Sequence, residues 1–116
     1  MVVDAPADED VDRLFHALSD TTRRDILHRC IAGEPSVSRL AEVYPMSFAA
    51  VQKHVAILER AGLVRKERIG RRKVVRTNLA GLLVARRLLD QYEALWRGRV
   101  GRMTDLIADK SKETHR

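Results

Sequence analysis

The sequence predicts a mainly helical domain with one β-hairpin, in the order α-α-α-α-β-β-α. Two observations predict this: apolar residues recur at spacings of three and four along most of the chain, and only 63–77 has the alternation and β-branched content of strands. The 116 residues suffice for one hydrophobic core. No run approaches the roughly 18 apolar residues of a membrane span. The acidic N-terminus does not resemble a secretory signal, so we expect a cytoplasmic protein.

The first two helices are predicted over 11–18 and 21–32. Asp20, after Ser19, can cap the second helix, and Gly33 is expected just beyond its end. Residues 1–10 are expected to form a flexible acidic tail. The predicted apolar faces contain Val11, Leu14, Phe15 and Leu18 in the first helix, and Ile26, Leu27, Cys30 and Ile31 in the second.

The next two helices have the dimensions of a helix-turn-helix. Ser36 starts a short helix that Pro45 ends, because the residue before proline is disfavoured in the helical region. Ser47 then caps a helix over 48–60, and Gly62 lies past its end. The buried stripe of this fourth helix is expected to consist of Val51, Val55 and Leu58.

A basic hairpin is predicted next, from the β-prone runs 63–69 and 73–77. Gly70 and Arg71 form the turn between them, and glycine in the first position suits a type II′ turn. The hairpin is a candidate wing beside the fourth helix.

Asn78 is predicted to cap a final long helix over 79–109, followed by a frayed tail over 111–116. Its apolar stripe is longer than a small monomer can cover, which favours a twofold dimer over a helix folded back on its own core. The stripe contains Leu82, Ala85, Leu89, Tyr92, Trp96, Val100, Met103 and Ile107.

The charge of the chain is concentrated. The formal net charge is +6, but the first 12 residues hold five carboxylates and no Lys or Arg, so 13–116 carry 22 basic and 11 acidic residues. Eight of these cations lie within 60–76, against Glu67 alone. A localised basic stripe is typical of a protein that binds the nucleic-acid backbone, although a solvated basic surface is the alternative.

The fourth helix has a face suited to the DNA major groove. With its apolar stripe inward, small and long polar residues point outward. Gln52 can pair with adenine, and Lys53 can reach guanine or a phosphate. Ser47 can bind a phosphate beside free backbone N–H groups. The alternative is an ordinary exposed amphipathic helix with Ser47 only as its cap.

Two stretches resemble ArsR/SmtB-type bacterial winged-helix repressors: LFHALSDTTRRDILHRC at 14–30 and VSRLAEVYPMSFAAVQKHVAILERAGLVRKERIGRRKVVRTN at 37–78. The resemblance implies a winged helix-turn-helix fold. The sequence has no glycine-rich phosphate loop, HExxH motif or nucleophile elbow, so we predict no enzymatic activity. The resemblance also implies a repressor that forms a homodimer through the first and last helices and binds a palindromic double-stranded operator.

The resemblance assigns candidate sites residue by residue. Family members usually carry a polar residue at Phe48, which here either contacts a thymine methyl or is packed away. Arg23 and Arg24 are lesser candidates for backbone contact. The other DNA-binding candidates are Ser47, Ala49, Gln52, Lys53, His54, Arg71 and Arg72. The dimer candidates are Leu14, Phe15, Leu18, Leu89, Tyr92 and Trp96.

We predict no metal and no cofactor. Metal-sensing members carry a cysteine pair in the third helix, or carboxylate and histidine ligands in the last, and neither arrangement occurs here. Cys30 is expected to be a buried thiol, with redox sensing as a minor option. The effector stays open. The alternatives are a metal- or redox-gated repressor and a dimeric basic module, interacting or architectural, without sequence specificity.

Overall fold

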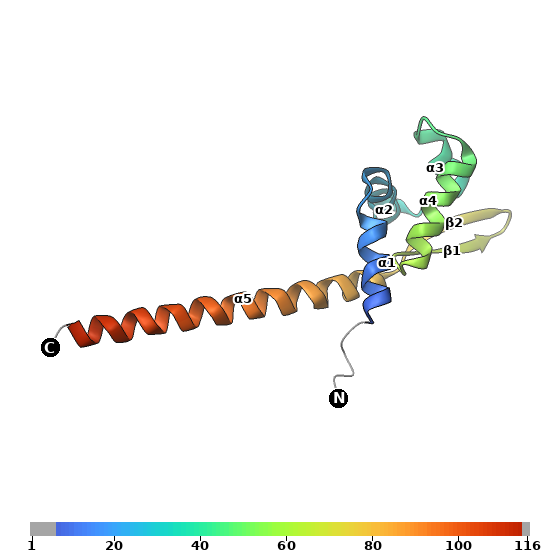
Figure 1. Ribbon diagram of the computed structural model, residues 1–116. Helices are drawn as coiled ribbons and strands as arrows, with labels where there is room; N and C mark the ends of the chain where they lie inside the picture. The colour runs from blue at the N-terminus through green and yellow to red at the C-terminus, as the bar shows by residue number, and fades with distance from the viewer. Residues whose placement is uncertain (1–6, 115–116) are drawn as a thin grey trace. The chain divides into compact units, whose positions relative to one another are not determined.

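The computed structural model describes residues 7–114 and confirms the predicted element order (Figure 1). The chain forms two compact units, the first ending at Ala85 and the second beginning at Arg86, within the last helix. The elements are α1 (Asp8–Leu18), α2 (Thr21–Gly33), α3 (Val37–Val43), α4 (Phe48–Arg60), β1 (Val64–Ile69), β2 (Arg72–Thr77) and α5 (Leu79–Thr114).

Side-chain caps determine where most helices begin. In α2, α3 and α4 the residue before the helix accepts a hydrogen bond from the backbone N–H three residues later, at 3.0–3.1 Å. Before α5, Asn78 Oδ1 accepts from the N–H of Ala80 at 3.1 Å. These bonds satisfy donors that a helix start leaves free. The predicted caps Asp20, Ser36, Ser47 and Asn78 are therefore confirmed.

Both terminal helices are longer than predicted. Helix α1 begins at Asp8, inside the predicted 1–10 tail, because three acidic residues in its first turn complement the positive end of the helix dipole. Helix α5 continues to Thr114 rather than ending near residue 109. The remainder of both predicted tails, 1–6 and 115–116, lies outside the described residues.

The end of α2 also differs from the prediction. Gly33 is helical, and Glu34 takes the positive φ of +23° instead. The chain must reverse there because the next residues pair with the wing: the N–H of Val75 donates to the carbonyl of Pro35 at 2.9 Å, and Ser36 bridges to Val74. A tertiary contact therefore sets this turn.

The hairpin has the predicted two-residue turn. Ile69 pairs with Arg72, and Gly70 has a φ of +64°, as the first position of a type II′ turn requires. The root of the hairpin rests on the first unit's core. That core consists of Leu14, Ala17, Ile26, Leu27, Cys30, Val37, Leu40, Val51, Val55, Leu58, Leu63, Val64 and Val75.

Two glycines allow α5 to start against the end of α4. Gly62 has a φ of +74°, and the N–H of Gly81 donates to its carbonyl at 3.0 Å. A Cβ on Gly81 would lie 2.3 Å from that carbonyl oxygen, so no side chain fits. The N–H of Asn78 also donates to the carbonyl of Leu63 at 2.8 Å. Together these bonds fix the first turns of α5 on the hairpin root.

Candidate nucleic-acid interface

The predicted inward and outward faces of α4 are confirmed. Val51, Val55 and Leu58 are completely buried in the core. The opposite face is open to solvent, with Ala56 half-buried along it. The exposed residues of this face and its flank are Phe48, Ala49, Gln52, Lys53 and Arg60.

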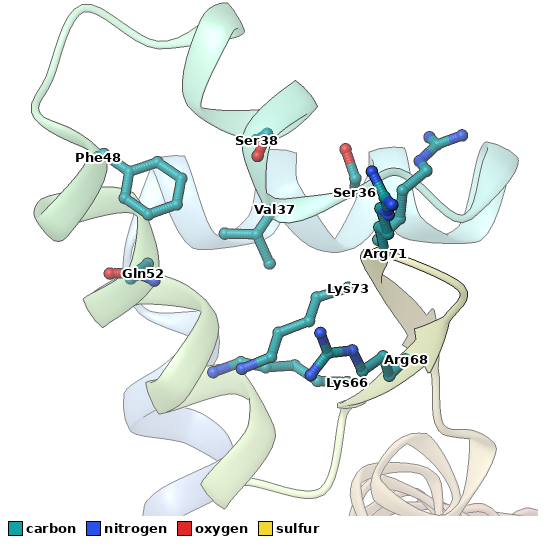
Figure 2. A pocket seen from close by; sticks show the side chains of 10 residues that line it. Ser36, Val37, Ser38, Phe48, Gln52, Lys66, Arg68, Arg71 and Lys73 are labelled. Atoms are coloured by element: carbon teal, nitrogen blue, oxygen red, sulfur yellow. The ribbon is translucent and has the colours of Figure 1, made fainter.

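A groove lies between this face and the wing. Its volume is about 410 Å³, and it is lined by the start of α3, by Phe48 and Gln52 of α4, and by the hairpin (Figure 2). None of its lining residues is acidic. Figure 2 shows Lys66 and Lys73 reaching from the hairpin toward α4. The hairpin contributes five cations: Lys66, Arg68, Arg71, Arg72 and Lys73.

Most of the charge in this groove is uncompensated. Lys66 lies 3.8 Å from Glu59, whereas the other four cations form no ion pair among the described residues. Glu67, the one carboxylate of the hairpin strands, pairs at 2.8 Å with Arg76, outside the groove. The groove is therefore a concave surface of one charge sign, which concentrates the field toward polyanions.

Lys66 and Arg68 were not among the predicted site residues, although the sequence carries a signal for them. They lie two residues apart on β1, and alternate residues of a strand share one face. That spacing places both side chains on the groove face, beside the predicted turn cations.

Arg23, predicted as a candidate for backbone contact, has its guanidinium occupied within the fold. Its side chain is only 7% exposed and donates to two carbonyls at the end of α1, Ala17 through Nε and His16 through Nη2, each at 2.9 Å. The last carbonyls of a helix lack partners within it, so the guanidinium satisfies them. Arg24 is exposed and donates to the carbonyl of Leu18 at 2.7 Å.

His54, predicted to lie near DNA, belongs to the same network, and its place there favours a structural role. Its Nδ1 lies 3.3 Å from Nη1 of Arg23 and 4.0 Å from a carboxylate oxygen of Asp20. Its side chain is mostly buried rather than part of the exposed face of α4. The backbone N–H of Arg23, with lesser help from nearby cations, holds the pKa of Asp20 below its ordinary value.

The predicted dimer residues separate into two groups. Leu14 is 1% exposed in the chain's own core, so its assignment to a dimer surface is wrong, and Leu18 is half-buried against that core. Phe15, the neighbour of Leu14, is exposed. In the second unit Leu89, Tyr92 and Trp96 are all more than half exposed.

Ile31 was predicted on the apolar face of α2, and it too is exposed.

The described chain offers neither a cluster of metal ligands nor an exposed thiol. Among residues 7–114 no three His, Cys, Asp or Glu side chains gather as metal ligands. Cys30 is buried, which raises the pKa of its thiol to about 11. No helix in this part of the chain is long and apolar enough to cross a membrane.

In this chain, a short helix precedes α4, which has one buried apolar face and one exposed face, and a cationic hairpin lies beside it. This arrangement defines a winged helix-turn-helix DNA-binding protein. The sequence matches a helix-turn-helix domain family over residues 18–67. It is 38% identical to the HTH-type transcriptional regulator Rv2034 of Mycobacterium tuberculosis over 81 residues, which are 70% of this chain and 76% of that protein.

Solved structures agree. An ArsR-like transcriptional regulator from Rhodococcus sp. RHA1 is 32% identical over 87% of this chain and 93% of its own, with a TM-score of 0.77. A homodimeric winged helix-turn-helix domain of a possible ArsR-family regulator from Mycobacterium bovis is 32% identical over 74% of this chain and 79% of its own, with a TM-score of 0.58. The chain belongs to the ArsR family of DNA-binding transcriptional regulators, a family of regulators and not of enzymes.

Proposed function

We propose that this chain is a repressor that binds a palindromic operator as a homodimer in the bacterial cytoplasm. The observation that carries the proposal is the exposed face of α4 beside a groove with four unpaired cations and no acidic lining residue among those described. The groove suits the phosphate backbone, and the helix face suits the base edges of the major groove.

Gln52 and Lys53 are the residues proposed to read bases. Both are exposed, and both line an open hollow with three alanines of α4 whose small side chains permit close approach. Arg71 and Arg72 at the wing tip are proposed to contact phosphate. The hydroxyl of Ser47 accepts the N–H of Ala50 as a cap and can still donate its own hydrogen to a phosphate.

The apolar surface of α5 supports the dimer. Within the second unit the stripe that includes Tyr92, Trp96 and Met103 is exposed, and Trp96 alone leaves 62% of its surface open. A contiguous apolar face of this kind is typical of a protein interface. A second copy covers it with its own identical face in a twofold arrangement. The Mycobacterium bovis relative is a homodimer.

Repression requires only that the dimer occupy its operator and exclude polymerase. No residue of the described chain needs to change state for that. Cys30 gives little support to a redox-gated alternative because its thiol is buried and its pKa is raised.

Selection of binding sites from random duplexes by the purified protein tests the proposal. We expect an inverted repeat with half-sites about one DNA turn apart, roughly 10 base pairs. A reporter placed behind the selected site should be repressed. Gln52→Ala and Lys53→Ala should lose the selected sequence, while Arg13→Ala on α1 is the matched control. Equal affinity for all duplexes would favour an architectural binder, and release by zinc or a mild oxidant would favour a gated sensor.

A further inference from the structure

Phe48 is an exposed aromatic residue at the start of α4, the helix proposed to read bases. It is the first residue of α4, and 48% of its surface is open to solvent. Figure 2 shows its ring at the groove, on the wall that also carries Gln52 and opposite the cations of the hairpin. About half of this residue is therefore open, and its ring lines the groove proposed for DNA.

Phe48 and Gln52 form a pair along one helix face. Residues four apart in a helix lie one above the other, separated by about 6 Å along the axis. The rise of duplex DNA is about 3.4 Å per base pair on each strand, so this separation spans roughly two base-pair steps. A helix lying in the groove therefore presents these side chains to the same or neighbouring base pairs.

The two side chains suit different halves of an A·T pair. The side-chain amide of Gln52 can donate a hydrogen bond to N7 of adenine and accept one from N6 of the same base. A phenyl ring can pack against the C5-methyl group of thymine. The thymine methyl group is the largest apolar group that a base pair presents in the major groove. An exposed phenyl ring beside an amide is thus complementary to an A·T-containing step.

We propose that Phe48 is a specificity-determining residue that recognises a thymine methyl group within two base pairs of the adenine that Gln52 binds. The inference rests on the proposed function, since it assumes a specific site. It predicts that each half-site contains a thymine whose methyl group contributes to affinity. Phosphate contacts at the wing contribute equally on every sequence and do not create this preference.

Replacement of thymidine by deoxyuridine tests the inference, because it removes one methyl group and leaves base pairing intact. Each thymidine of a selected site is replaced in turn, and affinity is measured with the full chain. At one or two positions per half-site we expect wild-type protein to lose about fourfold in affinity, the contribution of one buried methyl group. Phe48→Ala should lose about the same on the normal site and show no further loss on the deoxyuridine site.

Two variants control for indirect effects. Ile31→Ala removes an exposed apolar side chain from α2, away from the groove lining, and should keep the full deoxyuridine sensitivity. Phe48→Leu preserves an apolar contact and should retain part of it. Thermal melts confirm that each variant is folded.

The outcomes separate this inference from the function on which it depends. If wild-type protein binds its site and no deoxyuridine substitution weakens it, Phe48 reads no methyl group and the inference is wrong. Equal sensitivity in wild type and Phe48→Ala would also overturn it, because another residue would then contact the methyl group. Failure to select any site would overturn the proposed function and this inference with it.

Discussion

Nη1 of Arg23 lies 3.3 Å from Nδ1 of His54, which joins the start of α2 to the middle of α4. The same guanidinium donates to two carbonyls at the end of α1. One buried side chain therefore connects three helices, and the position of α4 depends on it.

Arg23→Met should destabilise the fold by about 3 kcal/mol, because it leaves two carbonyls at the end of α1 without their charged donor. Urea unfolding measures the loss. Arg24→Met is the matched control: this neighbour is exposed, and we expect a loss within about 1 kcal/mol. Arg23→Lys should not rescue, since an ammonium lacks the planar fork that reaches several acceptors. Equal losses for Arg23→Met and Arg24→Met would contradict the network.

The local elements of this fold were predictable because their signals are local. Caps such as Ser47 act on an N–H three residues away, and the turn at Gly70 depends on its own φ. The burial of Arg23 was not predictable in this way: its partner His54 lies 31 residues further along the chain. The positive φ of Glu34 likewise follows from pairing between the following segment and β2.

The sequence predicts which side chains are exposed where helical periodicity separates an apolar face from a polar one. It does not predict this where neighbouring residues are both apolar. Val51 and its stripe set the outward face of α4, and Gln52 and Lys53 follow from that. Leu14 and Phe15 are neighbours and both apolar, yet one is in the core and the other is exposed. Only the packing of α1 distinguishes them.

Asp25 makes stability depend on acid pH. The hydroxyl of Tyr44 donates to its carboxylate, as does Nε of Arg29, and these bonds hold the pKa of Asp25 below its ordinary value of 3.8, the Tyr44 bond most strongly. A carboxyl whose folded pKa is lowered stabilises the fold above its unfolded pKa and loses that contribution as pH falls through the folded pKa. Tyr44→Phe should therefore reduce the loss of stability below about pH 4.

Urea unfolding at several pH values from about 6 to 2 measures this dependence. The variant should lose about 1 kcal/mol or less at neutral pH, since one hydrogen bond is removed from a half-exposed carboxylate. Asp25→Asn is the control, because it removes the titrating carboxylate itself and should flatten the same part of the pH curve. Parallel pH curves for wild type and Tyr44→Phe would contradict the assignment.

Gly81→Ala should destabilise the first unit by about 3 kcal/mol, as expected for overpacking against a backbone atom. The new Cβ would lie 2.3 Å from the carbonyl oxygen of Gly62, so the start of α5 would have to shift. Gly101→Ala is the internal contrast in the same helix: a Cβ there would meet nothing within 4 Å, and alanine should stabilise the helix by up to about 1 kcal/mol. Thermal melts of both variants test this, and a tolerated Gly81→Ala would refute the close approach.

The Cys30 thiol should be unreactive in the folded protein. It is 2% exposed and its pKa is about 11, so at pH 8 only about one molecule in a thousand carries the reactive thiolate. Labelling with a disulfide reagent should be slow in buffer and fast in urea, with the rise following unfolding. A cysteine introduced at the exposed Ala49 should react at once and serves as the positive control. Rapid labelling of Cys30 without denaturant would revive redox gating.

The wing cations should contribute phosphate contacts that do not depend on sequence. Arg71 and Arg72 line the groove without an ion pair among the described residues, so they are free to release counterions from DNA. For each phosphate contact, log K should fall with log salt by about 0.9.

Arg71→Ala and Arg72→Ala should each reduce the slope of log K against log salt by about one and weaken binding to specific and random duplexes alike. Gln52→Ala should instead keep the slope and lose discrimination between them. Titrations at four salt concentrations decide the matter: a wing variant with an unchanged slope does not contact phosphate, and a Gln52 variant with a reduced slope contacts the backbone rather than a base.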